Sequence, residues 1–193
     1  GTAEDPRLVA LVPRFAELLQ ATGLKPDQIS AATVFTTQSV THEGMTVADD
    51  ISSRSWTWDE GGKCTTVGQM RRCNLEFQGM DYRVNDVFVD GTPQAGWTMP
   101  VTAWLPEGDG PFPTVLFGHG IGGDRSQGGY FAEFLTSIGI ALIAIDAVAH
   151  GNHPGGSGGG GQGSVIQFFG IDIAAFKING RILRDNWRQS AWD

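Results

Sequence analysis

A glycine-rich segment near the middle of the chain has the composition of an anion-binding turn. Residues 118–123 read GHGIGG and directly follow the apolar run TVLF at 114–117. Glycine has no Cβ, so the backbone N–H groups of such a turn can point into a cleft without obstruction. We expect the ring of His119 to brace this turn through hydrogen bonds rather than to carry protons.

The same letters also satisfy the pattern GxGxxG, and Asp146 stands at the end of the next predicted strand. That is the arrangement of a dinucleotide site, in which the helix begins inside the glycine motif so that its N-terminus faces the pyrophosphate. Here the residues DRSQGG at 124–129 delay the helix. A nucleotide-dependent oxidoreductase therefore remains an alternative, while the favoured interpretation needs no cofactor.

A second motif is the pentapeptide 155–159, GGSGG, which satisfies the nucleophile-elbow pattern GxSxG. A nucleophile elbow needs a buried strand directly before the serine and a helix directly after it. Ser157 instead lies in a glycine tract that follows Asn152-His153-Pro154. We therefore expect Ser157 not to be a nucleophile.

Three other histidines could serve as bases or ligands. His42, His150 and His153 lie in polar or glycine-rich stretches, so we expect each of them to be a solvated surface residue. None of the histidines has ligand spacing around the two cysteines, and the cysteines do not form a CxxC pair. No metal site is expected.

The two cysteines, Cys64 and Cys73, flank the eight residues TTVGQMRR. In an oxidising compartment they could close a short loop, which would stabilise the fold by ~2.5 to 3 kcal/mol. We expect a disulfide and, with it, a secreted or periplasmic location. The alternative is a pair of idle thiols in a reducing cytosol.

Charge and hydropathy exclude two classes of partner. The chain has 21 acidic residues against 13 Lys and Arg, a net charge of -8, and no basic block, so nucleic acid is not an expected partner. The longest apolar run, 138–145, falls far short of the ~20 residues that span a bilayer. No transmembrane segment is expected.

The elements that must position these residues follow from hydrophobic periodicity. With 193 residues, of which 40% are hydrophobic, we expect one domain over 1–193. Segment 38–72 is predicted to be an irregular surface excursion, and the glycine-rich segment 151–163 a flexible loop beside the substrate entrance. Helices are predicted at 6–20, 130–138 and 181–192, and strands at 32–37, 73–82, 86–89, 97–105, 114–117 and 140–145.

The order strand, helix, strand at 114–145 predicts a βαβ unit and hence a parallel pair of strands. Both strands are continuous apolar runs, which is typical of strands covered on both faces. The helix between them should turn four apolar side chains inward: Phe131, Phe134, Leu135 and Ile138. The predicted fold class is therefore α/β, with antiparallel strands on the N-terminal side followed by the parallel βαβ unit.

Several stretches resemble a known family. PEGDGPFPTVLFGHGIGG, IALIAIDAVAHG and RILRDNWRQSAWD resemble the N-terminal half of an α/β-hydrolase, and AATVFTTQS resembles bacterial extracellular lipases of the virulence-factor type. The resemblance implies an oxyanion hole to which Gly120 and Ile121 contribute backbone N–H groups, with His119 as the brace of the turn. The nucleophile, acid and histidine of that family have no counterpart in these residues.

The favoured expectation is therefore the oxyanion-hole-bearing half of a secreted serine ester hydrolase, a lipase or carboxylesterase. Its partners would be an ester or lipid substrate and a C-terminal hydrolase half on a second chain, and this chain alone would be inactive. Phe168 and Phe169 are the expected substrate-binding residues. The alternative is a non-catalytic module of the same fold that binds an apolar ligand in a pocket lined by Phe168, Phe169 and Phe176.

Overall fold

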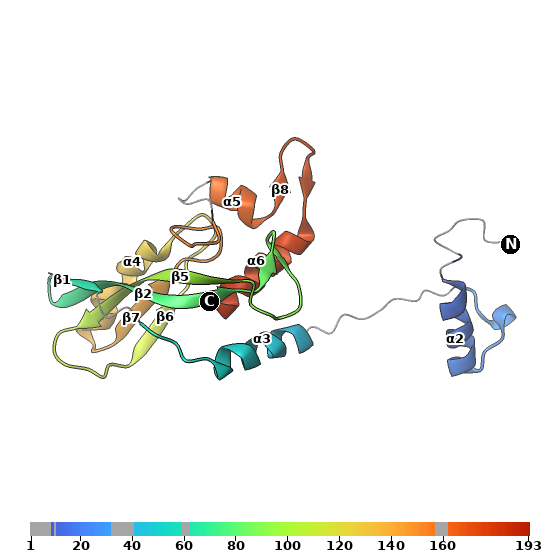
Figure 1. Cartoon of the computed structure of the whole chain (residues 1–193), viewed down its shortest axis with the longest axis horizontal. Helices are drawn as coiled ribbons and strands as arrows, with labels where there is room; N and C mark the ends of the chain where they lie inside the picture. The colour runs from blue at the N-terminus through green and yellow to red at the C-terminus, as the bar shows by residue number, and fades with distance from the viewer. Residues whose placement is uncertain (1–8, 10, 32–40, 59–61, 157–161) are drawn as a thin grey trace. The chain divides into compact units, whose positions relative to one another are not determined.

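The chain divides into two compact units, Gly1–Val40 and Thr41–Asp193. The expectation of one domain over 1–193 is therefore wrong. The computed structural model describes residues 9, 11–31, 41–58, 62–156 and 162–193 (Figure 1). The predicted strand at 32–37 and Ser157 lie outside these residues, as do positions 157–161 of the predicted flexible loop.

The first unit contains the predicted amphipathic helix, α2 (Val12–Thr22), followed by the short 3-10 helix η1 (Pro26–Gln28). The helix ends at Gly23, which adopts the left-handed conformation with φ 68° and donates its N–H to the Leu19 carbonyl. Glycine adopts this conformation at little cost, which explains why the helix stops there. None of the residues of α2 is buried within the described part of the chain.

The second unit is built on a five-stranded sheet with the order β1-β2-β5-β7-β6. Neighbouring strands are antiparallel except β6 and β7, which are parallel. The strands are β1 (Lys63–Val67), β2 (Met70–Asp81), β5 (Ala95–Pro106), β6 (Thr114–Phe117) and β7 (Ala141–Ile145), and two small hairpins add β3 (Arg83–Val84) with β4 (Val87–Phe88) and β8 (Ile171–Asp172) with β9 (Lys177–Ile178).

The parallel pair is the predicted βαβ unit. β6 is followed by η2 (Arg125–Gly128) and α4 (Gly129–Ser137), and the chain then returns as β7. The fold class is α/β, as the sequence predicts, with antiparallel strands first and the βαβ unit after them. Because β6 and β7 are parallel, the residues that follow Phe117 and Ile145 emerge at the same edge of the sheet.

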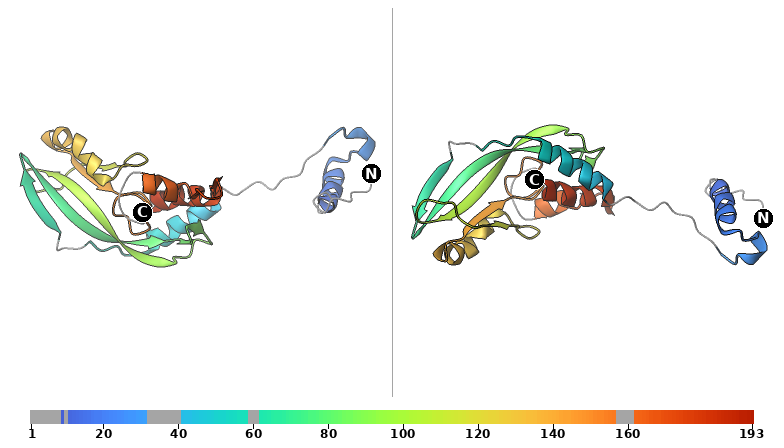
Figure 2. Two further views of the ribbon diagram at one scale, coloured as in Figure 1. Left: turned by 90° about the horizontal axis from the view of Figure 1, so that it is seen from above. Right: turned by 90° about the horizontal axis from the view of Figure 1, so that it is seen from below.

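Helices pack on both faces of this sheet. On one face, α4 contributes Ala132 to a core with Trp104 and Leu142. Side chains alternate between the two faces along a strand, so Val101 points to the other face. There α3 (His42–Ser53) and α6 (Gly180–Trp192) lie side by side (Figure 2). An ion pair between Arg188 of α6 and Glu43 of α3 joins the two helices. α5 (Gln162–Phe168) packs beside α6.

The prediction of an irregular excursion at 38–72 is wrong, because this segment contains α3 and β1. Val47 and Ile51 lie one helical turn apart, and Val47 is fully buried against Tyr82 and Phe88. β1 pairs with β2, and this pairing places Cys64 directly opposite Cys73. The two cysteines form the predicted disulfide, which therefore links two strands rather than holding down a loop.

The prediction that both strands of the βαβ unit are buried on both faces by their neighbours is also wrong in part. β7 is largely buried, but Val115 and Leu116 of β6 are 41% and 68% exposed. Of the four side chains predicted to point inward, Leu135 packs partly buried against the core around Trp104, but Phe131, Phe134 and Ile138 are exposed. The helix instead buries Ala132 and Thr136. The reason is Trp104, whose indole fills the space under the helix so closely that a Cβ on Gly128 would lie 2.9 Å from it. Only small side chains fit there.

A hydrogen bond between Tyr82, which directly follows β2, and Asp50 of α3 ties this helix to the end of the sheet. The Tyr82 hydroxyl donates to Asp50 Oδ2 at 2.8 Å, and Arg54 donates to the same carboxylate. The hydrogen bond from Arg54 holds the Asp50 pKa below its ordinary value of 3.8. Burial of the carboxyl opposes this effect, and the hydrogen bond from Tyr82 lowers the pKa further.

Tyr82→Phe should lower the free energy of unfolding by about 1 to 2 kcal/mol at neutral pH. Because the pKa of Asp50 is lower in the folded state, its contribution is present above the ordinary carboxyl pKa and is lost as pH falls through the folded value. Denaturation of both proteins at neutral and acidic pH should therefore show a destabilisation that shrinks on acidification. Tyr130→Phe, at an exposed position, is the matched control; equal effects of the two variants would contradict the role of this contact.

Candidate functional site

The glycine turn lies at the C-terminal edge of the parallel pair, directly after β6. Its Gly122 adopts φ 77°, and the Gly123 N–H donates to the Gly120 carbonyl at 3.0 Å. The Ile121 side chain is exposed, so the turn lies at the surface. The helix α4 begins only at Gly129, after η2, so the glycine motif does not open the long helix as it would in a dinucleotide site.

His119 uses its two ring nitrogens to link the turn to the chain that follows β7. Its Nε2 lies 2.9 Å from the Ala147 backbone nitrogen, so this ring nitrogen must accept the Ala147 N–H. Its Nδ1 lies 2.8 Å from the Gly120 carbonyl oxygen, so Nδ1 carries the proton and donates it to this oxygen. These partners assign the neutral Nδ1–H tautomer, and they give the ring the bracing position that the sequence predicts.

The two hydrogen bonds on the Gly120 carbonyl orient the peptide that joins Gly120 to Ile121. In a trans peptide the C=O and N–H groups point in opposite directions. The Ile121 N–H therefore points away from His119 and Gly123. Within the part of the chain that the structure describes, it donates to no hydrogen-bond acceptor. A free, surface-directed backbone N–H of this kind can bind a negatively charged oxygen.

The residues that end the turn are fixed by Asp146, whose side chain is fully buried at the end of β7. Its Oδ1 accepts the Arg125 N–H at 2.6 Å, and its Oδ2 accepts the Asn152 N–H at 2.9 Å and the Arg125 guanidinium. Asp124, just before Arg125, caps η2 by accepting the Ser126 N–H at 2.7 Å. Hydrogen bonding from the Ser126 side chain holds the pKa of Asp124 below its ordinary value, so this cap is an anion at neutral pH.

Two of the other histidines are buried, which corrects the expectation of solvated residues. His150 and His153 are each 2% exposed. The Nδ1 of His150 lies 2.8 Å from the Val148 carbonyl oxygen, while its Nε2 has no partner among the described residues. The Nδ1 of His153 accepts the Gly155 N–H, so its Nε2 carries the proton and donates to Asp193 at 2.9 Å. The sequence does not reveal this burial, because the glycine-rich stretch around these histidines has the composition of a solvated loop.

The expected substrate-binding phenylalanines lie in a third core rather than in a pocket. Phe168 is 1% exposed and packs with Val148 and Ala149, with the partly buried Phe169 at its edge. Phe176, by contrast, is almost fully exposed. The structure therefore does not bring these three side chains together around a common cavity.

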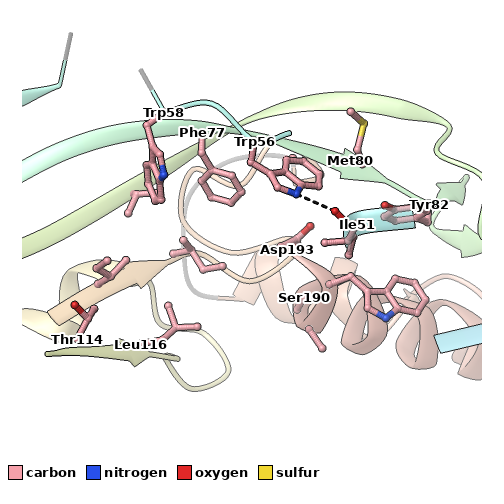
Figure 3. Close-up of a pocket in the computed structure, with 16 residues that line it drawn as sticks. Ile51, Trp56, Trp58, Phe77, Met80, Tyr82, Thr114, Leu116, Ser190 and Asp193 are labelled. Atoms are coloured by element: carbon pink, nitrogen blue, oxygen red, sulfur yellow. Dashed lines mark hydrogen bonds between the residues drawn. The ribbon is translucent and has the colours of Figure 1, made fainter. Parts of the chain in front are cut away.

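A largely apolar cavity instead lies on the sheet face opposite α4. It has a volume of about 570 Å³, and Figure 3 shows Trp58 and Phe77 on one side of it and Leu116 of β6 on the other. Ser190 and Asp193 at the end of α6 and Thr114 of β6 contribute polar groups to its lining (Figure 3). Its remaining walls are Ile51, Trp56, Gly79, Met80, Tyr82, Val101, Ile143, Ile145, Ala191 and Trp192.

The described ranges contain neither a candidate metal site nor a candidate membrane-spanning helix. No cluster of three or more His, Cys, Asp or Glu side chains there could hold a metal ion. No helix within these ranges has the length and apolar character needed to cross a bilayer.

No protein-family model and no curated protein matches this chain. Among solved structures, it is similar to acetyl xylan esterase 1 of Thermoanaerobacterium sp. (16% identity, 83% of this chain and 44% of that one, TM-score 0.48) and to an acetyl xylan esterase of Paenibacillus sp. (16%, 69% and 38%, TM-score 0.42). A cold-adapted esterase from an Arctic intertidal metagenomic library is also similar (22%, 50% and 35%, TM-score 0.34). This chain spans less than half the length of these esterases, and likenesses of this size carry no argument about its activity.

The opposite hydrogen-bond partners of two histidines give a direct test of the turn. At about pH 8.5, where an unperturbed imidazole is neutral, ¹⁵N spectra of the side chains should show the Nδ1–H tautomer at His119 and the Nε2–H tautomer at His153. His153 serves as the internal control, because both spectra come from one sample. The Nε2–H tautomer at His119 would mean that its ring does not accept the Ala147 N–H.

Proposed function

We propose that this chain supplies the oxyanion-binding side of a secreted serine ester hydrolase, of the lipase or carboxylesterase type. The observation that supports this most directly is the orientation of the peptide between Gly120 and Ile121: the Ile121 N–H points away from His119 and Gly123 and donates to no acceptor among the residues that the structure describes. An oxyanion hole needs preorganised donors of this kind, because they cost no reorganisation when negative charge develops on the substrate carbonyl.

In this proposal the nucleophile, the acid and the catalytic histidine come from a C-terminal hydrolase half on a second chain. The exposure of β6 supports such a partner, since its apolar side chains Val115 and Leu116 are left uncovered at the edge of the described sheet. An exposed apolar edge strand is a template for pairing with another strand. The proposed location is secreted or periplasmic, because the bond between Cys64 and Cys73 persists in an oxidising compartment.

The same argument makes the isolated chain inactive. A donor at Ile121 lowers the barrier only when a nucleophile reaches the carbonyl that the donor binds. Without the nucleophile, the negatively charged tetrahedral intermediate does not form, and the donor has nothing to stabilise.

The apolar cavity favours a second candidate, a non-catalytic module that binds an apolar ligand. The cavity is lined largely by aliphatic and aromatic side chains, including Trp58 and Phe77, whose rings are 5.6 Å apart. Saturable binding of a fatty acid by the isolated chain, with no ester hydrolysis in the presence of the second chain, would favour this module over the hydrolase.

The hydrolase is tested with short-chain p-nitrophenyl esters. The chain alone should give no turnover, and addition of a second chain that carries a GxSxG strand with a downstream Asp and His should restore it. In that assembly Ile121→Pro, which removes the N–H, should lower kcat by about 10² to 10³-fold. Ile121→Ala keeps the N–H and is the matched control, with folding of both variants checked by their thermal unfolding.

Turnover by the isolated chain that is abolished by Ser157→Ala would overturn this proposal. It would make the serine of the glycine tract the nucleophile and remove the need for a second chain.

A further inference from the structure

We propose that Asp146 is a positioning residue that fixes the glycine turn from both of its ends. Its consequence for catalysis rests on the proposed function, while its consequence for the turn does not. Asp146 ends β7, and the parallel pairing of β6 with β7 places it beside the residues that follow β6. Its side chain lies outside the walls of the apolar cavity and does not reach Gly120 or Ile121 directly.

The C-terminal end of the turn is held by the carboxylate itself. Both oxygens are occupied by donors: the Arg125 N–H at 2.6 Å, the Asn152 N–H at 2.9 Å, and the Arg125 guanidinium. Three donors, one of them the Arg125 guanidinium, thus converge on the two oxygens of a single buried side chain. The guanidinium of Arg125 compensates the charge, without which burial of the carboxylate would be unfavourable.

The N-terminal end of the turn is held by the residue next to Asp146. The Ala147 N–H donates to His119 Nε2, and His119 in turn donates to the carbonyl of Gly120. The buried side chain of Asp146 fixes where the backbone leaves β7, and thereby where the Ala147 N–H points. A single dipeptide thus fixes His119 at the start of the turn and Arg125 two residues after its end.

Gly151 supplies independent support for the importance of this carboxylate. A Cβ on Gly151 would lie 2.3 to 2.5 Å from the carboxylate atoms of Asp146, and Gly151 adopts φ 50°. The chain after His150 therefore passes against the carboxylate so closely that only glycine fits without moving it. Gly151→Ala should displace the carboxylate and so reproduce the effect of Asp146→Asn without altering the acid itself.

The test measures amide hydrogen exchange by NMR in the full 193-residue chain. The reporter is the Gly123 N–H, which is protected by the Gly120 carbonyl and is separated from Asp146 in the sequence. Asp146→Asn and Gly151→Ala should each accelerate exchange at Gly123 by about tenfold or more, with exchange at Ala144 in β7 unchanged. The controls are Asp90→Asn, an exposed acid that accepts a backbone N–H, and Gly96→Ala, where a Cβ meets nothing within 4 Å.

The His119 tautomer is a second readout that a purely structural role would not alter. Loss of the Ala147 N–H from Nε2 should convert the Nδ1–H signature of His119 to a mixture in both variants, while His153 keeps its Nε2–H form. Should Asp146→Asn fail to fold, Arg125→Gln keeps the backbone bond to Asp146 and removes only the guanidinium, and it should show a smaller acceleration at Gly123.

Folded variants with unchanged Gly123 exchange and unchanged His119 tautomer would overturn the positioning role. In the two-chain ester assay the variants should lower kcat with little change in KM, because the turn contributes mainly in the transition state. If no variant and no wild-type assembly hydrolyses esters while the exchange and tautomer effects appear, the positioning role stands and the proposed function fails.

Discussion

The second unit depends on a buried ion pair at one end of a short strand. Asp146 is fully buried and Arg125 is largely so, and a carboxylate in that position would be strongly unfavourable without compensation. The fold satisfies it with two backbone N–H groups as well as the guanidinium. Because those N–H groups belong to different loops, satisfying one charge fixes the path of three segments. The polar contacts at the C-terminal end of β7 therefore arise from the need to compensate the buried charge of Asp146, not from packing of the hydrophobic core.

The core, for its part, is organised by a few large side chains. Trp104 occupies the space between the sheet and the start of α4, where only Ala132 and the backbone around Gly128 come close, while Leu135 packs partly buried against the same core. The two phenylalanines of α4 are left on the outside. On the opposite face Trp192 packs against Tyr82 and Phe88, and α6 is held there by Gln189, which bonds the backbone of Tyr82 and Met80.

Local patterns predicted most strands of the sheet and two of its helices but missed α3 and β1, and they predicted the surroundings of the elements poorly. The strand at 114–117 and the helix at 181–192 follow directly from apolar runs and periodicity, and the structure has them with the predicted bounds or within one residue of them. Which face of α4 is buried depends on Trp104, which is distant in sequence, and periodicity contains no information about it. The turn at 118–123 could be found from its glycines, but the role of Asp146 could not, because its partners Arg125 and Asn152 are brought to it only by the strand order.

The geometry of β6 connects the free donor to the exposed edge. β6 is the edge strand of the described sheet, and the turn with its free Ile121 N–H begins one residue after the strand ends. A further strand that paired in parallel with β6 would lie about 4.8 Å from it, and its C-terminal end would lie beside the C-terminal end of β6. The residue that followed such a strand would therefore stand beside the turn, where a nucleophile must be if Ile121 is to bind the oxygen of the carbonyl under attack. The apolar side chains that remain exposed on β6, one toward each face, are those that a strand covered on both faces would bury. The same short strand thus offers both the donor and the place beside it, which is why the proposed second half of the active site belongs beside β6 and not beside β1, the edge strand on the opposite side of the sheet.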